Sequence, residues 1–408
     1  MEIKNFDVVI VGAGPAGCAC AIQLAKTNLN VAIIDKSVFP RDKTCGDALS
    51  YDVVNQLQML SPELSQNFQK LSLKLPSGGV RIFSPDRNKI DIPFIHAGKK
   101  SEGFTCKRID FDNFLFQHVK SLSKIHVFEN CACNQIREDA DKIVVITDSI
   151  TFYSKMIVGA DGAHSLIAKR SGNMAVDKDH YSAGLRVYYK NVTGFQENNF
   201  IELHFLKEVL PGYLWIFPMS NNEANVGLGI LSSAVAKNKI NLKEKLTEVL
   251  KSDPVFKERF KNAEPLETIK GYGLPLGSKK RKLSGSRFLL TGDAASMIDP
   301  FSGEGIGNAI RCGRVAAEHI QKCFAEDNFS SEFNLQYDRE IYRRMWNELR
   351  VSRMLQQLLK HPWLYNLIVR KANKNKYLKQ FVTEALADVD TKKKLIVSPL
   401  FYLRVLFG

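Results

Sequence analysis

The N-terminal stretch of residues 7–35 constrains the fold of this chain more than any other part of its sequence. It contains the β-branched run Val8–Val11, the glycine-rich segment 12–17 and a second apolar run, Val31–Ile34. A β-branched run followed by a glycine turn is typical of a buried parallel strand. Residues 15–26 between the two runs are predicted to be helical, with a proline at the start, where a missing N–H costs nothing. The stretch therefore predicts a βαβ unit of an α/β fold.

The glycines of this unit have the spacing G-x-G-x-x-G, and an acid, Asp35, lies 23 residues after Gly12. Gly12 is expected to make the tight turn, Gly14 to let the backbone reach a pyrophosphate, and Gly17 to let helix and strand pack closely. The helix N-terminus offers free N–H groups to phosphates, and Asp35 can hold ribose hydroxyls. The pattern predicts a dinucleotide site that includes Gly12, Gly14, Pro15, Ala16, Gly17, Asp35 and Lys36.

The length and composition fit a multidomain globular protein. The chain has 408 residues, 45% of them hydrophobic and 25% charged, which suggests two or three domains. Its eight cysteines form no metal-binding pattern, so no metal site is expected. We expect a cytoplasmic protein, because no signal peptide precedes the first strand and no apolar window approaches the length of a membrane span.

Most of the net charge of +14 lies at the C-terminal end. Residues 341–408 contain 14 Lys or Arg against 4 acids. Such a region could meet nucleic acid, acidic lipid headgroups or only water. Because no zinc finger, RNP-like or helix-turn-helix pattern is present, we expect no nucleic-acid partner.

Two further apolar runs end in polar motifs like those of the first strand. Residues 156–159 lead into Asp161-Gly162, and residues 288–290 lead into Gly292-Asp293 and a glycine-rich loop at 300–308. A helix is expected from about residue 106 to 123, with Asp110 or Asp112 as its cap. Residues 181–231 alternate apolar and polar side chains, which predicts an antiparallel sheet with one buried face.

These patterns predict a discontinuous nucleotide-binding domain. Its segments are expected near 1–60, 105–175 and 268–328, with a β-sheet substrate domain from 61–104 and 176–267. Residues 329–408 are expected to form a helical, basic C-terminal region.

The three strand-end motifs, in this order, resemble those of the flavoprotein family of aromatic hydroxylases (the p-hydroxybenzoate hydroxylase fold). The resemblance covers about residues 5–325. It implies a Rossmann-like domain that binds FAD, with Asp35 on the adenosine ribose, Asp293 on ribityl or ribose hydroxyls, and Arg108 near the flavin and pyrophosphate. Glycines in the 300–308 loop would expose N–H groups toward the flavin. The implied FAD residues here are Arg108, Asp161, Gly292, Asp293, Gly303, Gly305 and Ile306.

A second pattern indicates the branch of this family. Residues 213–229 fit Y-x-W-x-F-P-x8-G-x-G and resemble the signature of geranylgeranyl reductases, in which the motif lines a prenyl pocket. Residues 43–46 resemble that family's K-x-C-G segment, whose cysteine, here Cys45, faces the flavin with Gly46 beside it. An aromatic stripe on the buried face of a strand is the other interpretation of this motif. The implied substrate residues are Tyr213, Trp215, Phe217, Pro218, Gly227 and Gly229.

The resemblance implies an FAD-dependent oxidoreductase that reduces C=C bonds of a geranylgeranyl-type chain by hydride transfer from reduced flavin. Two alternatives stay open: a monooxygenase of an aromatic or apolar substrate, and a flavin-dependent halogenase. Cys45 is one candidate proton donor, with Asp47, Tyr213 and His96 as others. The electron donor is expected to be NAD(P)H or ferredoxin, and the sequence does not choose between them.

The C-terminal tail has two interpretations. Three lysines at 392–394 precede an interrupted apolar run, 395–407, with Trp363, Tyr365 and Tyr402 nearby. This segment could contact an anionic membrane surface peripherally, as suits an enzyme with a prenyl lipid substrate. It could equally pack as a helix with a solvated basic face.

Overall fold

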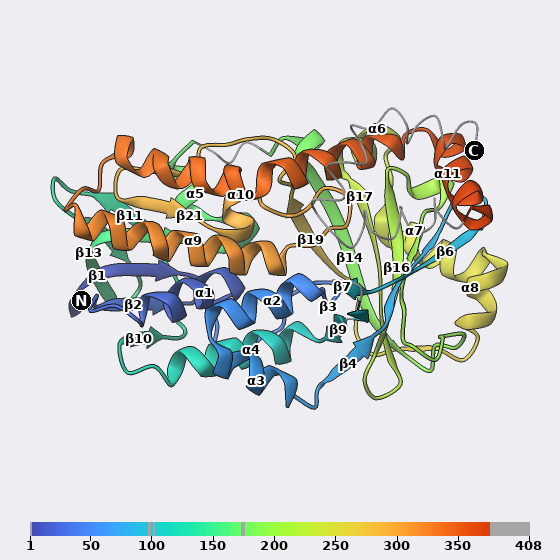
Figure 1. Cartoon of the computed structure of the whole chain (residues 1–408), viewed down its shortest axis with the longest axis horizontal. Coiled ribbons are helices and arrows are strands. Elements are labelled where there is room, and N and C mark those ends of the chain that lie inside the picture. The colour runs from blue at the N-terminus through green and yellow to red at the C-terminus, as the bar shows by residue number, and fades with distance from the viewer. Residues whose placement is uncertain (1, 97–98, 101–102, 173–175, 376–408) are drawn as a thin grey trace.

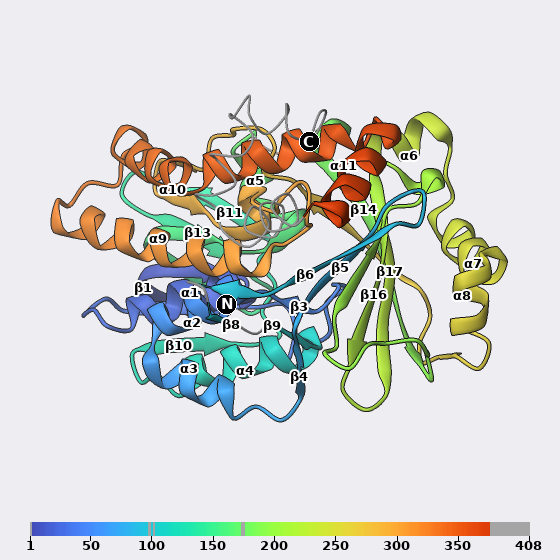
Figure 2. The ribbon, with the colours of Figure 1, turned by 45° about the vertical axis from the view of Figure 1, so that its right-hand side comes forward.

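Two sheets side by side make up the body of the protein. The computed structural model describes residues 2–96, 99–100, 103–172 and 176–375. A mainly parallel sheet lies at the N-terminal side and a mainly antiparallel sheet beside it. The long helix α10 (Ser331–Leu358) runs from the first toward the second (Figures 1 and 2).

The first sheet holds the apolar runs identified in the sequence. β13 pairs with β12 through its first half and, in parallel, with β21 through its last residues. The strands lie in the order β10 (Ile125–Phe128), β2 (Val31–Ile34), β1 (Glu2–Val11), β13 (Ile150–Gly159), β12 (Ile143–Ile146) and β11 (Gln135–Glu138), with β21 (Phe288–Leu290) beside β13 and β20 (Ser284–Gly285) beside β21.

The register of this sheet brings its polar strand ends together. Val11 pairs with Ile34 on one side and with Gly159 on the other, and Gly159 pairs with Leu290. The four parallel strands therefore end level with one another. The motifs that follow them, separated by up to 280 residues in the chain, meet at one edge of the sheet, where open α/β sheets bind ligands.

Helices pack against the first sheet and continue beside the second. Helices α1 and α9 pack against each other through Gly313, where an added Cβ would come within 2.2 Å of the Ala16 carbonyl oxygen. The other helices surround the two sheets (Figures 1 and 2). The bounds are α1 (Pro15–Leu24), α2 (Tyr51–Leu60), α3 (Pro62–Gln69), α4 (Arg108–Lys120), α5 (Leu166–Arg170), α6 (Ser232–Asn238), α7 (Leu242–Ser252), α8 (Pro254–Arg259), α9 (Ile306–Ala325) and α11 (Pro362–Lys374).

The second sheet is antiparallel except where β15 pairs with β5. β19, which falls in the segment 268–328, pairs with β14 of this sheet. The order is β18 (Glu264–Pro265), β14 (Tyr181–Lys190), β17 (Glu223–Leu231), β16 (Gly212–Met219), β15 (Ile201–His204), β5 (Gly79–Phe83) and β6 (Lys89–Pro93), with β19 (Lys270–Pro275) on β14. Two small sheets consist of β3 (Ala48–Leu49), β9 (Gly103–Cys106) and β4 (Lys74–Ser77), and of β7 (Ile95–His96) and β8 (Lys99–Lys100).

Strand β16 shows how the two faces of this sheet differ. Leu214 and Ile216 are fully buried and belong to the core that α7 and α8 cover. Successive side chains of a strand point to opposite faces, so Tyr213, Trp215 and Phe217 point away from that core. The aromatic stripe is therefore on the face turned toward the first sheet.

The predicted cap of α4 is wrong. The N-cap residue is Lys107, and neither Asp110 nor Asp112 caps the helix. Asp112 instead forms ion pairs with Arg108 and Arg41, whose charges outcompete a backbone N–H for its carboxylate.

The C-terminal region is helical as far as it is described, through α10 and α11. No described helix combines the length and apolarity required to span a bilayer. The tail segment 392–408, for which membrane contact or packing was expected, lies outside the described residues.

Candidate active site

One cavity of about 790 Å³ extends from the strand ends of the first sheet to the aromatic face of the second. Its walls are mainly apolar with a few polar groups, as is usual for small-molecule sites. The predicted residues that line it are Gly12, Gly14, Pro15, Ala16, Asp35, Lys36, Cys45, Gly46, Arg108, Asp161, Tyr213, Trp215, Phe217, Gly229, Asp293, Gly303, Gly305 and Ile306.

Four predicted site residues lie outside this lining as the described residues form it: Gly17, Pro218, Gly227 and Gly292. Three of them are packing positions. Added Cβ atoms would meet the Gly12 carbonyl oxygen at 1.9 Å from Gly17, the Trp215 indole at 2.0 Å from Gly227, and the Ala16 side chain at 3.0 Å from Gly292. Pro218 accepts a hydrogen bond from Thr105 through its carbonyl oxygen at 2.6 Å.

The glycine-rich turn leaves bare backbone at the cavity. Gly12 has φ +102°, and a side chain there would collide with the Ala160 carbonyl oxygen. At Gly14 an added Cβ would have only the end of Arg41 within 4 Å, at 3.6 Å. Gly14 is also the N-cap of α1 and gives it no side-chain cap. The first N–H groups of α1 are therefore free of a capping side chain, next to open space that a phosphate could fill.

Asp35 lies at the carboxyl end of β2 in a fixed orientation. Its Oδ2 accepts a hydrogen bond from the Ala13 N–H at 2.7 Å, and its Oδ1 accepts one from the Ser37 N–H at 2.8 Å. Each carboxylate oxygen can accept more than one hydrogen bond. The side chain is thus oriented by the backbone while still able to accept from hydroxyl groups in the cavity.

Asp161 and Asp293 stand at the ends of β13 and β21. Asp161 Oδ2 accepts from the Leu166 N–H at 2.8 Å, and burial raises the pKa of this carboxyl above its usual range. Asp293 pairs with Lys43 at 3.0 Å. This contact joins the end of β21 to the loop that carries Cys45, so the predicted K-x-C-G segment lies beside the strand ends.

Arg108 lines the cavity, but its guanidinium is committed. It donates two hydrogen bonds of 2.7 Å to Asp112, which Arg41 also contacts at 2.6 Å. Burial would raise the pKa of Asp112, but the charges of Arg108 and Arg41 outweigh it and hold that pKa below its usual range. The two arginines are therefore fixed in place by one buried carboxylate.

The aromatic wall depends on the two glycines opposite it. Trp215 pairs with Gly227 and Tyr213 pairs with Gly229 across β16 and β17. The indole lies over Gly227 so closely that a Cβ there would be 2.0 Å away, whereas at Gly229 it would be 3.7 Å away. The G-x-G spacing therefore makes room for an aromatic ring on the cavity face of the sheet.

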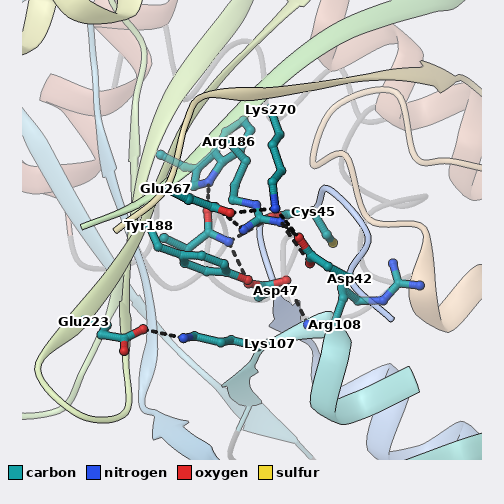
Figure 3. Close-up of polar contacts among 12 residues, drawn as sticks. Asp42, Cys45, Asp47, Lys107, Arg108, Arg186, Tyr188, Glu223, Glu267 and Lys270 are labelled. Carbon is teal, nitrogen blue, oxygen red and sulfur yellow. Dashed lines mark hydrogen bonds and ion pairs between the residues drawn. The ribbon is translucent and has the colours of Figure 1, made fainter. Parts of the chain in front are cut away.

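A buried carboxylate, Asp47, anchors the Cys45 loop, and the sequence indicated it only as a minor proton-donor candidate. Asp47 is 0% exposed and has φ +66°. Its Oδ2 accepts from Tyr188 Oη at 2.5 Å and from Asn225 Nδ2 at 2.8 Å, and its Oδ1 accepts from the Arg108 N–H at 3.3 Å (Figure 3). Burial raises its pKa to about 6, although these donors and Arg186 oppose the shift.

Asn225 connects this anchor to the aromatic wall. Its amide also donates to the Cys45 carbonyl oxygen at 2.8 Å and accepts from Trp215 Nε1 at 2.8 Å. Beyond Tyr188, the fully buried Arg186 pairs with Asp42 at 2.8 Å and with Glu267 at 2.5 Å (Figure 3). The loop, the sheet and the aromatic side chains are thus held in one polar network.

Glu304 lines the cavity but is not predicted by the sequence, because only the glycines around it belong to a recognisable pattern. It accepts a hydrogen bond from Ser50 Oγ at 2.6 Å. Two residues earlier, the Ser302 carbonyl oxygen accepts from Tyr213 Oη at 2.5 Å. Burial, and next the charge of Asp52, raise the pKa of Glu304 to about 7. Of the other proton-donor candidates, Cys45 is partly exposed, and the side chain of His96 is not described.

Comparison with known proteins identifies the family of the chain. The family described as FAD binding domain matches residues 5–346. The digeranylgeranylglycerophospholipid reductase of Methanocaldococcus jannaschii is 29% identical over 397 residues, covering 95% of this chain and 93% of that protein. The menaquinone reductase of Mycolicibacterium smegmatis is 30% identical over 322 residues, covering 76% and 75%.

A solved structure has the same fold. A geranylgeranyl bacteriochlorophyll reductase-like protein from Thermoplasma acidophilum superposes with a TM-score of 0.80 over 97% of this chain and 99% of its own, at 21% identity.

Proposed function

Because the chain belongs to the FAD binding domain family and is an FAD-dependent oxidoreductase similar to geranylgeranyl reductases, we propose that it reduces C=C bonds of a prenyl chain. The hydride would come from reduced flavin. The substrate class is carried over from relatives named for the reduction of digeranylgeranylglycerophospholipid and menaquinone.

The observation that carries the proposal is the continuity of the cavity. A single space reaches from Asp35 and Asp293 at the strand ends to Trp215 and Phe217 on the second sheet. A dinucleotide at the strand ends and an apolar chain against the aromatic wall would therefore share one enclosure. Sharing matters because hydride transfer requires the reacting atoms to be almost in contact.

The residues at the strand ends fit FAD. We assign the pyrophosphate to the bare backbone at Gly14 and the N-terminus of α1, and the adenosine ribose to Asp35. Asp293 would hold the ribityl or ribose hydroxyls. The N-cap of α9, Gly305, also gives its helix no side-chain cap, so N–H groups remain there for a partly negative ring. Bound FAD supplies the hydride.

The aromatic wall suits a polyisoprenoid. Its rings offer no charge to desolvate, and burial of the chain is worth about 0.8 kcal/mol per CH₂ group. Tyr213, Trp215 and Phe217 would hold the chain, with Gly229 beneath it and Cys45 and Gly46 at the reacting end. A prenyl chain bound there would also displace water from the reduced cofactor.

We propose NAD(P)H or ferredoxin as the source of electrons. We also propose that the protein reaches its lipid substrate through peripheral contact with an anionic membrane. Trp363 on α11 is 65% exposed, and Leu355 of α10 and Leu359, directly after that helix, line the cavity. An exposed indole near a lipid cavity suits a membrane interface. Sedimentation with anionic liposomes, with and without residues 392–408, tests this: equal sedimentation of the two would contradict a role for the tail.

Mass spectrometry tests the reaction. Dithionite-reduced holoprotein is incubated without oxygen with geranylgeranyl lipids and with menaquinone. We expect a product two mass units heavier for each double bond reduced, because two hydrogens are added. Unchanged prenyl chains across all lipid classes would contradict the proposal. A product 16 mass units heavier, formed only with NAD(P)H and oxygen, would show a monooxygenase instead.

A further inference from the structure

We propose that Glu304 donates the proton that completes reduction of the prenyl double bond, an inference that rests on the proposed function. Hydride transfer supplies a hydrogen nucleus and an electron pair to one carbon only. The other carbon requires a proton, and a prenyl chain that fills the cavity would displace water from around its double bond. The donor must therefore be a group on the cavity wall that is protonated at working pH.

Glu304 lies where three walls of the cavity meet. It belongs to the loop between Asp293 and α9, and Ser50, the residue directly after β3, donates to its Oε1 at 2.6 Å. The third wall is the aromatic one, which meets the same loop where Tyr213 Oη donates to the Ser302 carbonyl oxygen. Glu304 is thus adjacent both to the Cys45 loop and to the proposed prenyl site, and it lines the cavity itself.

The charges around Glu304 favour its protonated form. Asp52 Oδ2 and Glu304 Oε1 both lie 2.7 Å from the Cβ position of Gly307, so the two carboxyl groups are close neighbours. Asp299 on the same loop and Glu348 on α10 add negative charge.

One guanidinium, that of Arg311 on α9, faces these acids. It contacts Asp52 at 2.7 Å and Glu348 at 3.7 Å. Within the described part of the chain, no ion pair reaches Glu304. With Asp52 paired and Glu304 unpaired, the proton of the cluster is best placed on Glu304.

The surroundings also stabilise the Glu304 carboxylate that forms when the proton leaves. Glu304 immediately precedes Gly305, the N-cap of α9, and a helix N-terminus favours a neighbouring carboxylate. The Ser50 hydroxyl continues to donate to it. Both forms of the side chain are therefore accommodated, as a group that cycles between them requires.

The other candidates are less suited. Tyr213 already donates its hydroxyl hydrogen to Ser302, and burial raises its pKa, so it holds its proton. Asp47 is fully buried and accepts hydrogen bonds on both of its oxygens, two of them on Oδ2, so its carboxyl group is tied to the groups around it. Glu304 Oε2, by contrast, accepts no hydrogen bond from a side chain in the part of the chain that the structure describes.

The step balances without a further reactant. The π bond of the alkene breaks, and two C–H bonds form. One carbon of the alkene receives the hydride, with its electron pair, from reduced flavin. The other carbon receives the proton from the Glu304 carboxyl group. Flavin is oxidised by two electrons, the alkene is reduced by two, and the Glu304 carboxylate regains a proton from water after product release.

Single-turnover kinetics of E304Q test the assignment. The glutamine keeps an oxygen for Ser50 but carries no transferable acid, so the fold and FAD content are expected to be unchanged. We expect the rate of flavin reoxidation by a geranylgeranyl lipid to fall by about 100-fold or more, the usual range for loss of a general acid. E304D, which restores an acid, is expected to recover part of the rate.

The pH profile separates a proton donor from a structural residue. Because the acid form of Glu304 is required, the wild-type rate is expected to fall as pH rises through about 7. This decrease, the alkaline limb of the pH profile, is expected to be absent from E304Q. E340Q provides a matched control, since Glu340 pairs with Arg343 and Arg344 on the outer side of α10. It is expected to behave as wild type.

An infrared titration gives a readout without turnover. Holoprotein is expected to show a protonated-carboxyl band that disappears as pH rises through about 7 and is absent from E304Q. A wild-type rate and pH limb in E304Q, or an unchanged band in that variant, would overturn the inference alone. A wild-type protein that reduces no prenyl chain would overturn the proposed function, and this inference with it.

Discussion

Asp47 and Glu304 stand on two loops of one cavity, and their surroundings are opposite in kind. Asp47 accepts hydrogen bonds from a tyrosine, an asparagine and a backbone N–H, and the buried Arg186 lies beyond them (Figure 3). Glu304 accepts one from Ser50 and otherwise faces carboxylates. Burial raises the pKa of both, to about 6 and about 7.

The difference separates two uses of an acid whose pKa is raised, one fully buried and one partly buried. A carboxylate filled by donors fixes the groups around it, and moving its proton would disturb all of them. A carboxyl group with a free oxygen can exchange its proton at little structural cost. We therefore assign Asp47 to holding the Cys45 loop in place and Glu304 to chemistry.

The largest stability effect is expected at Asp47. D47A leaves Tyr188, Asn225 and the Arg108 N–H without their acceptor, so it should lower the free energy of unfolding by about 3 kcal/mol. E304Q keeps its one hydrogen bond and should lie within about 0.5 kcal/mol of wild type. Urea unfolding of the holoproteins measures both. If E304Q were the less stable of the two, the comparison would fail.

Gly227 tests the link between the aromatic wall and Asp47. In G227A the new Cβ would lie 2.0 Å from the Trp215 ring and 2.3 Å from the Leu185 carbonyl oxygen, so the indole must move away from Asn225. Overpacking of this kind costs about 2 kcal/mol, again measurable by urea unfolding.

G229A is the matched control for this change. Its Cβ would be at an ordinary 3.7 Å from the same ring, and stability should change by less than about 0.5 kcal/mol. The infrared band of Glu304 should be unchanged in both variants. Equal destabilisation by the two substitutions would contradict the packing argument.

The smallest effect is the pH dependence that Asp47 gives to stability. Its pKa in the folded protein, about 6, is above its value of 3.8 in the unfolded chain, so folding favours the protonated form. The associated stability is complete below the unfolded pKa and is lost as pH rises through the folded one. Between pH 5 and 7 the loss should be about 1 kcal/mol.

D47N isolates this contribution, because asparagine tolerates φ +66° and keeps an oxygen for Tyr188 and Asn225. Urea unfolding at pH 5 and 7 should show that the difference in stability between wild type and D47N changes by that amount. A difference that stays constant with pH would show that Asp47 does not titrate in this range.

Local patterns predicted the strands whose ends meet at one end of the cavity. The β-branched runs and the glycine spacing are short-range signals, and the register of β1, β2, β13 and β21 places Gly12, Asp35, Asp161 and Asp293 at one edge. The Y-x-W-x-F-P motif likewise predicted the strand that contains it, because the alternation of side chains along a strand is visible in neighbouring residues of the sequence.

The polar contacts could not be predicted in this way. Asp47 meets Asn225 across 178 residues, and Ser50 meets Glu304 across 254. No spacing rule connects such pairs, and each depends on how two sheets and a loop pack. The error at α4 has the same origin: Asp110 or Asp112 is expected to cap the helix, but Arg41, 71 residues before Asp112, reaches that carboxylate in the folded chain.

Anaerobic stopped-flow absorption most directly tests the central claim, that one cavity holds flavin and prenyl chain together for hydride transfer. Reduced holoprotein is mixed with a geranylgeranyl lipid, and the flavin spectrum is followed while product is collected. The account predicts that one flavin is reoxidised for each double bond saturated, with oxygen absent. Flavin that stays reduced until oxygen is admitted, with the lipid unchanged, would contradict it.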